Sequence, residues 1–332
     1  MSRPTALRVR DTMGIFVRYP ARPVPRRGKI VPTELSRDDV RRAQVLAPVG
    51  VFDSGVGGLT VLRALAAALP DEDFVYLGDT ARLPYGTKSP ESIRRYALQA
   101  AGLLKARGIK CLVVACNTAS AVALESLAAG FAPVPVLGVL EPGAAAACRA
   151  TRSRRIAVIA TESTVRGGAY QRAIARRLPS AEVTARACPL FVALAEEGWT
   201  DGPIVEAVAH RYLDDLFGEA AAAARPDTLV LGCTHFPVLA PTLQAVLGPR
   251  VSIVDSAATT AAALAGVLAE RGLTRPAASG GGSLALLATD GAERFARVGG
   301  TFLGRAFDPA QVEIVDIAGY EPRPSTPFDT SH

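Results

Sequence analysis

Residues 111–120 read CLVVACNTAS, an apolar run that ends one residue before a thiol, Cys116. Residues 228–237 read TLVLGCTHFP and repeat this order, with a second apolar run, one small residue and then Cys233. A short run rich in Val and Leu that ends in a turn is typical of a buried parallel strand. Ligands of open α/β sheets bind outside the carboxyl ends of such strands. The two segments therefore predict two functional thiols, one in each half of the chain.

Polar residues follow each thiol. They are Asn117 and Thr118 in the first segment, and Thr234 and His235 in the second. Such side chains can cap the next helix or donate hydrogen bonds to an anion. The alternative is that both cysteines are inert core residues, because free cysteine is among the most buried residue types. Two cysteines in matching contexts favour the functional interpretation.

Apolar runs alternate with helix-like segments along the rest of the chain. This alternation predicts an α/β fold with largely parallel sheets, and two similar halves with a cleft between them. Taken alone, the pattern divides the chain once, near residue 150. The further strands that we predict lie at residues 49–52, 74–77, 134–139, 156–159, 183–187, 251–254 and 284–288.

Length and composition exclude several classes of protein. The chain has 332 residues, 49% of them hydrophobic, which is enough for a large core. No apolar stretch reaches membrane-spanning length without a charge or a breaker, so we expect a soluble protein. Five cysteines are an odd number, which argues against a disulfide scaffold and for a reducing compartment. There is no C-x-x-C pair and there are only three histidines, so we expect no metal site.

The positive charge is concentrated at the start of the chain. Residues 1–47 carry eleven basic and four acidic side chains, a net charge of +7, so the remaining chain carries −1 of the total of +6. Such an extension could bind nucleic acid or an acidic partner. The alternative is a flexible, solvated tail.

Two loops at predicted strand ends could bind anions. Residues 53–58 read DSGVGG, a glycine-rich turn that offers backbone N–H groups, with Asp53 and Ser54 at its start. The turn matches neither a Walker A loop nor a G-x-G-x-x-G fingerprint. In the loop 78–88, Tyr85 and the backbone that follows it could bind a carboxylate.

A cleft with one thiol on each wall suits racemisation or epimerisation. One thiolate removes a proton from a carbon acid, and the opposite thiol donates a proton to the other face. A protonatable neighbour such as His235 can lower a thiol pKa. Pyridoxal phosphate would require a Schiff-base lysine, and no lysine of this chain stands at a convincing strand end, so we expect no cofactor. Candidate donors to the carbanion are Ser54, Asn117, Thr118 and Thr234.

Four motifs, in this order, resemble those of bacterial glutamate racemases. They are FDSGVGGL at 52–59, GDTARLPYG at 78–86, VACNTA at 114–119 and LGCTHFP at 231–237. The likeness covers about residues 48–305. It implies a racemase that needs no pyridoxal phosphate, works with two bases between two α/β domains, and supplies D-glutamate for peptidoglycan. Such an enzyme is expected in the bacterial cytoplasm.

The resemblance also implies roles for single residues. Cys116 would act on D-glutamate with support from Asp53, and Cys233 on L-glutamate with support from His235 and Glu196. Glu197 stays an alternative to Glu196, because a shift of one residue would exchange them. The residues that would hold the substrate are Ser54, Tyr85, Gly86, Asn117, Thr118 and Thr234.

The same resemblance divides the chain differently from the strand pattern. It implies a first domain of residues 48–140 plus 255–320, a second domain of 141–254, and an N-terminal extension of 1–47. It further implies a homodimer, and a regulatory contact of the extension with a cell-wall precursor or with DNA gyrase. Two positions depart from the family pattern: Gly167 stands where a serine is common, and Ala160 replaces a usual glycine.

Other functions stay open at this point. An aspartate or hydantoin racemase would also keep two cysteines, whereas a related decarboxylase needs only one. The loop at 84–86 favours glutamate by resemblance only. The chain could instead act mainly as a nucleic-acid-binding module through its basic extension. A redox pair of Cys116 and Cys233 is disfavoured, because two bases on either side of a substrate stand too far apart for a disulfide.

Overall fold

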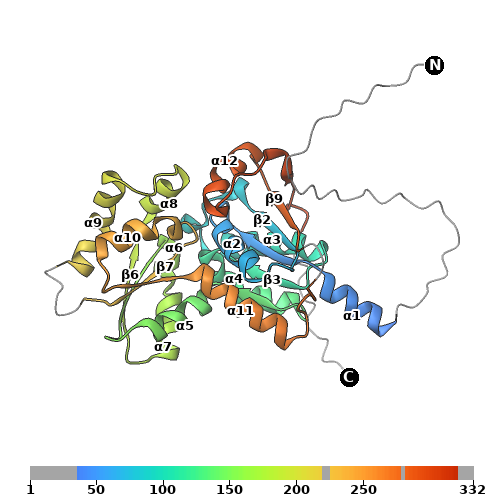
Figure 1. Cartoon of the computed structure of the whole chain (residues 1–332), viewed down its shortest axis with the longest axis horizontal. Helices are drawn as coiled ribbons and strands as arrows, with labels where there is room; N and C mark the ends of the chain where they lie inside the picture. Colours follow the sequence, from blue (N-terminus) through green and yellow to red (C-terminus); the bar gives the residue numbers. More distant parts are fainter. Residues whose placement is uncertain (1–35, 219–224, 278–280, 321–332) are drawn as a thin grey trace, which may run out of the picture.

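The protein is built on two parallel sheets (Figure 1). The computed structural model describes residues 36–218, 225–277 and 281–320. The first sheet has six strands in the order β10-β9-β2-β1-β3-β4, and all its neighbours pair parallel. The strands are β1 (Val49–Asp53), β2 (Phe74–Gly78), β3 (Cys111–Val114), β4 (Val136–Gly138), β9 (Leu284–Ala288) and β10 (Val312–Ile314).

The second sheet has four parallel strands in the order β6-β5-β7-β8. We call the part of the chain on the six-stranded sheet the first lobe, and the part on the four-stranded sheet the second lobe. The predicted α/β class with parallel sheets is therefore confirmed. The strands of the second sheet are β5 (Arg155–Ala160), β6 (Glu182–Ala187), β7 (Thr228–Gly232) and β8 (Ser252–Asp255).

The single division near residue 150 is wrong. The chain leaves the first sheet after β4, builds the second sheet, and returns to pair β9 with β2 and β10 with β9. The second lobe is thus inserted into the first. The strand pattern cannot show this return, because parallel strands join by crossovers and any later strand can take a free edge. The domain boundaries at 140 and 255 themselves stay a prediction.

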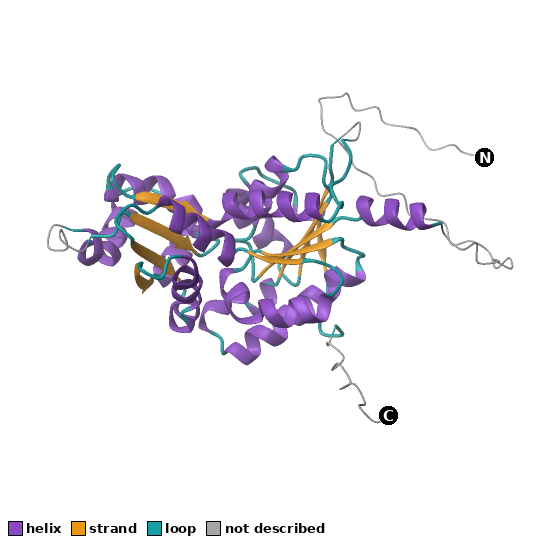
Figure 2. Cartoon of the chain, turned by 90° about the horizontal axis from the view of Figure 1, so that it is seen from below, coloured by secondary structure: helices purple, strands orange, loops and turns teal. Residues whose placement is uncertain are grey.

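Helices cover both faces of each sheet (Figure 2). One face of the first sheet packs on α2 (Leu59–Ala68), α11 (Ser256–Glu270) and α12 (Ala292–Leu303), and the other on α3 (Pro90–Ala106) and α4 (Asn117–Phe131). In the second lobe, one face packs on α8 (Pro189–Glu196), α9 (Pro203–Phe217) and α10 (Ala240–Leu247), and the other on α5 (Leu140–Ala150) and α7 (Ala169–Arg177), which α6 (Glu162–Gly167) precedes.

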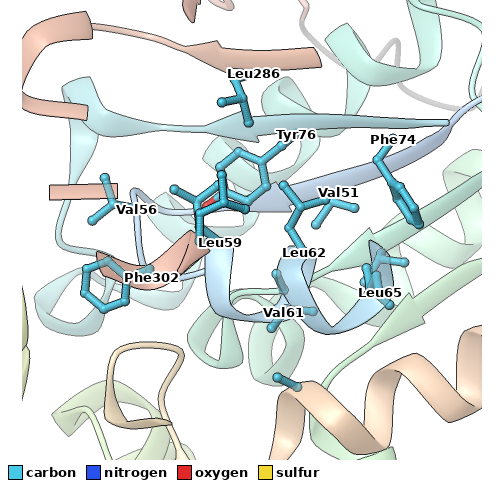
Figure 3. Close-up of a cluster of buried hydrophobic side chains, with 14 of the residues drawn as sticks. Val51, Val56, Leu59, Val61, Leu62, Leu65, Phe74, Tyr76, Leu286 and Phe302 are labelled. Atoms are coloured by element: carbon cyan, nitrogen blue, oxygen red, sulfur yellow. The ribbon is translucent and has the colours of Figure 1, made fainter. Parts of the chain in front are cut away.

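The core of the first lobe fixes the strand ends that carry the site. All five residues of β1 and of β2 are buried, as expected for strands that helices cover on both faces. Figure 3 shows Val51 and Tyr76 of these strands packed with Leu59 and Leu62 of α2. Phe302 of α12 belongs to the same cluster. This packing holds the turn between β1 and α2 against the sheet.

The start of the described chain is tied to the base of the first sheet. Of the predicted extension, residues 1–35 lie outside the described residues, whereas Arg37–Leu46 forms α1, a helix without buried residues. Lys110 Nζ donates to the carbonyl oxygen of Val45 at 2.7 Å and forms a buried ion pair with Glu72. A buried lysine requires such a partner. No helix among residues 36–218, 225–277 and 281–320 is long and apolar enough to cross a membrane.

Candidate active site

Cys116 lies between the carboxyl end of β3 and the first turn of α4. It is the N-cap residue of α4, and its Sγ accepts a hydrogen bond from the backbone N–H of Ala119 at 3.4 Å. We expected residues after the thiol to cap this helix; the thiol does so itself. A thiolate gains from the positive end of a helix. The N-terminus of α4 therefore favours the thiolate form of Cys116.

The other neighbours of Cys116 favour the neutral thiol. Burial raises the pKa of Cys116 to about 12, and the negative charge of Asp53 adds to this rise. Asp53 is fully buried and accepts a hydrogen bond from Gly55 N at 2.9 Å. Burial raises the pKa of Asp53 as well, against the positive charge of His235. Ser54 Oγ lies 3.6 Å from Cys116 Sγ. Cys116 is thus a neutral thiol near Asp53, and the raised pKa of Asp53 means that its carboxylate accepts a proton more readily than usual.

Cys233 follows β7 and has a different partner. Its Sγ lies 3.7 Å from His235 Nδ1, and His235 Nε2 lies 3.1 Å from Glu196 Oε1. Glu196 is the last residue of α8, while Glu197 is its C-cap. The carboxylate that contacts the histidine is therefore that of Glu196.

The histidine of this second wall is held in its charged form. Burial lowers the pKa of His235, but the hydrogen bonds and negative charges of Cys233 and Glu196 outweigh this effect and raise the pKa to about 10. Burial raises the pKa of Glu196, yet His235 and Arg294 lower it to about 2. At neutral pH the pair is an imidazolium and a carboxylate. An imidazolium beside a thiol stabilises its thiolate.

The two walls are brought together by contacts between the lobes. Thr60 Oγ1 of α2 donates to the carbonyl oxygen of Thr234 at 3.0 Å, and Thr234 Oγ1 lies 3.5 Å from Asp53 Oδ1. A Cβ atom on Gly57 would stand 2.5 Å from both Thr234 Oγ1 and His235 Nδ1. The glycine-rich turn thus lets the second lobe approach the first. In the structure, the turn of the first lobe that contains Gly57 therefore contacts Thr234 and His235 of the second lobe.

The amide of Asn117 presents an unused donor at the end of β3. Its Oδ1 accepts a hydrogen bond from the hydroxyl of Tyr170 at 2.7 Å, whereas its buried Nδ2 has no hydrogen-bond partner among the residues that the structure describes. Leaving a buried donor unpaired is costly, so such a group in a site is a candidate for ligand contact. Thr118 Oγ1 lies within 3.1 Å of the hydroxyls of Thr161 and Thr164 in the second lobe.

Tyr85 is held differently from the other candidates. Its ring is buried, and its hydroxyl donates to Asp79 Oδ2 at 2.5 Å. Burial and the charge of Asp79 raise the pKa of Tyr85 far above its usual value, so the hydroxyl stays a donor. A Cβ atom on Gly86 would stand 2.7 Å from Cβ of Thr161. This loop therefore closes against the second lobe, and the Tyr85 hydroxyl is already engaged.

Within residues 36–218, 225–277 and 281–320, no three His, Cys, Asp or Glu side chains are placed to hold a metal ion together. Comparison with known proteins identifies the family of the chain. The Asp/Glu/Hydantoin racemase family matches residues 50–264. The chain belongs to this family.

Relatives of the chain share most of its length. A glutamate racemase of Geobacter metallireducens is 52% identical over 256 residues, which are 77% of this chain and 92% of that protein. The solved glutamate racemase of Francisella tularensis in complex with D-glutamate has a TM-score of 0.75 and 34% identity, covering 82% of this chain and 99% of that chain. That of Thermus thermophilus in complex with β-chloro-D-alanine has a TM-score of 0.71 and 43% identity, covering 82% and 97%.

The two departures from the family pattern lie in different surroundings. A Cβ atom on Gly167 would meet no atom of the described residues within 4 Å, so it would not clash with them. Gly168 has a φ of +61° and separates α6 from α7, which suits glycine. Ala160 is the buried last residue of β5.

Three further residues of the site were not among those predicted from the sequence. Arg294 of α12 donates to Glu196, and Phe302 of α12 packs edge-on against the ring of His235, with 5.1 Å between the centroids. Tyr170 anchors Asn117 from the other lobe. The resemblance includes the segments TDG at 289–291 and FLG at 302–304 at the two ends of this helix, but the roles of Arg294 and Phe302 depend on the fold that brings α12 to the site. Tyr170 stands three residues after Gly167, one of the two positions that depart from the family pattern, and that segment could have indicated it.

Proposed function

We propose that the chain interconverts L-glutamate and D-glutamate without a cofactor, with Cys116 and Cys233 as the two bases. The observation that carries the proposal is the pair of thiols at strand ends of separate lobes, each near an ionisable side chain, Asp53 for Cys116 and His235 for Cys233. The relatives named glutamate racemase favour glutamate over aspartate or hydantoin as the substrate. A decarboxylase would have no use for the second thiol.

The proposed reaction moves one proton at each wall. With L-glutamate bound, the thiolate of Cys233 removes the α-proton, and Cys116 donates its thiol proton to the opposite face. The product D-glutamate leaves Cys233 as a thiol and Cys116 as a thiolate. The positive charge of the His235 imidazolium stabilises the Cys233 thiolate. Asp53 is the group that can exchange a proton with Cys116. In the reverse direction the two thiols exchange roles.

The carbanion between the thiols needs donors aimed at its carboxylate. Asn117 follows Cys116 directly, and its buried Nδ2 has no partner within residues 36–218, 225–277 and 281–320. The N-terminus of α4 adds backbone N–H groups. Donors that are fixed before the reaction stabilise the developing charge without reorganisation. Ser54, Thr118 and Thr234 complete the proposed binding set, while Tyr85 and Gly86 act by closing their loop over it.

Substrate exchange requires the lobes to separate. Cys116 is 5% and Cys233 6% exposed, so glutamate cannot reach them in the arrangement described above. The inter-lobe hydrogen bonds of Thr60, Thr234 and Thr118 join hydroxyl groups to carbonyl, carboxyl or other hydroxyl oxygens, and water can replace them. We infer that the lobes open to admit glutamate and close for the proton transfers.

The test follows the loss of optical activity of L-glutamate and, separately, of D-glutamate, without pyridoxal phosphate. We expect both signals to decay to zero, since enantiomers have equal free energies and the equilibrium mixture is racemic. Aspartate and a hydantoin serve as controls for the substrate. A protein that leaves both forms of glutamate unchanged would contradict the proposal, and conversion of aspartate alone would reassign the substrate.

We further propose that the reaction supplies D-glutamate for peptidoglycan in the bacterial cytoplasm, and that the enzyme is a homodimer. The basic extension is proposed to contact a cell-wall precursor or DNA gyrase. Its net charge of +7 favours an anionic partner.

Removal of residues 1–35 tests the role of the extension. The truncation should stop there, because the carbonyl oxygen of Val45 accepts from Lys110 and a longer deletion would expose a buried charge. We expect unchanged racemisation, and loss of any response to the precursor or inhibition of gyrase that the full chain displays. Size-exclusion chromatography with light scattering measures the dimer in parallel. Equal responses with and without residues 1–35 would remove the regulatory role.

A further inference from the structure

Arg294 joins the site from the lobe opposite to the histidine. Its Nη2 donates to Glu196 Oε2 at 2.7 Å, and the other oxygen of that carboxylate contacts His235. Arg294 belongs to α12, whose Phe295 and Phe302 are buried in the core of the first lobe. Glu196 ends α8, which packs in the second lobe. The ion pair therefore spans the two lobes.

Four side chains of the site form a linear series of contacts from the thiol to the arginine. Cys233 touches His235, His235 touches Glu196, and Glu196 touches Arg294. Glu196 is a flexible side chain at a helix end, so two partners are needed to fix both of its oxygens. The guanidinium is a planar donor that suits a carboxylate. Arg294 is 47% exposed and Glu196 17%, so the pair is screened by water and its value lies in geometry more than in stability.

We propose that Arg294 is a positioning residue that holds Glu196 against His235 only when the lobes are closed. The proposal rests on the proposed racemase function. The same helix places the ring of Phe302 against His235, so α12 contacts two members of the relay. Opening of the lobes would separate Arg294 from Glu196 and Phe302 from His235, so the imidazolium would no longer be held in place. The base at Cys233 would thus be fully assembled only around an enclosed substrate.

The charged groups around His235 decide whether removal of Arg294 raises or lowers the pKa of His235. Cys233 and Glu196 raise its pKa, the carboxyl group of Asp53 faces it from the first lobe, and Arg294 is the cation behind Glu196. If Arg294 acted by its charge alone, its removal would take away a positive charge and would raise the pKa of His235. If it positions Glu196, its removal frees that carboxylate and lowers the pKa of His235.

The test compares Arg294→Ala with Arg294→Lys and with Arg297→Ala, an exposed arginine one turn further along α12. We expect R294A to lower kcat/KM for glutamate roughly tenfold, since it loses one charge-assisted hydrogen bond. R294K should recover most of this loss, and R297A should match the wild type. The alkaline limb of the pH profile should move to lower pH in R294A only. Circular dichroism and thermal melting control for folding.

Isotope effects report which thiol is affected. Because the equilibrium constant of racemisation is one, kcat/KM must fall equally in both directions. The deuterium isotope effect on kcat/KM should rise with L-[2-²H]glutamate, whose deuterium goes to Cys233. It should fall with D-[2-²H]glutamate, whose deuterium goes to Cys116.

Three results would overturn the inference while wild-type activity upholds the proposed function: R294A equal to R297A, an alkaline limb that stays or moves up, or unchanged isotope effects. A wild type that does not racemise glutamate would instead remove the function on which the inference rests.

Discussion

Replacing either Cys116 or Cys233 with alanine should stop racemisation of both enantiomers, with a loss of roughly 10³-fold or more in kcat/KM. Each direction needs one thiol to remove the proton and the other to return one to the opposite face. The double variant should be no slower than either single variant, because residues that act as a unit do not contribute additively. The decay of optical activity from L-glutamate and from D-glutamate measures all three variants.

Cys148 provides the matched control for the loss of a thiol. It is a partly buried free cysteine of the second lobe whose pKa burial also raises, and its Sγ contacts the carbonyl oxygen of Ile174 and not the site. C148A should racemise both enantiomers at the wild-type rate. A C116A or C233A variant that still inverts one enantiomer at a comparable rate would contradict the two-base mechanism.

His235→Asn should lower kcat/KM by about 10²-fold, because the amide keeps polarity at this position but cannot carry the charge that supports the Cys233 thiolate. In the wild type the pKa of His235 is raised from 6.5 to about 10. Since the folded value lies above the ordinary one, the ring stays protonated through neutral pH and loses its charge only near pH 10. The wild-type rate should therefore fall as the pH rises through about 10, and this limb should be absent in H235N.

The measurement is the pH profile of kcat/KM from pH 6 to 10.5. His210→Asn is the control, because this histidine of α9 is exposed and pairs with Asp214 at 2.8 Å, away from both thiols. H210N should reproduce the wild-type profile. An H235N variant with wild-type activity and an unchanged alkaline limb would show that the imidazolium does not support the Cys233 base.

The sequence determined the features that depend on local order. The Val and Leu runs before Cys116 and Cys233 are strands of parallel sheets, as their short length, their β-branched residues and the turns that bound them predicted. The short motifs around both thiols also indicated the racemase family, since their residues are neighbours in the chain. For the same reason the motif at 52–59 placed Asp53, and the motif at 231–237 placed His235, near strand ends.

Only the tertiary structure decided which groups meet across the lobes. The return of β9 to the first sheet carries α12, and with it Arg294 and Phe302, to the histidine of the second lobe. The phase of α8 at its end selects Glu196 over Glu197 as the partner of His235. Gly57 could be read as part of an anion loop, but its missing side chain serves the approach of the lobes. Such pairings join residues far apart in the chain, and packing rather than local sequence fixes their distances.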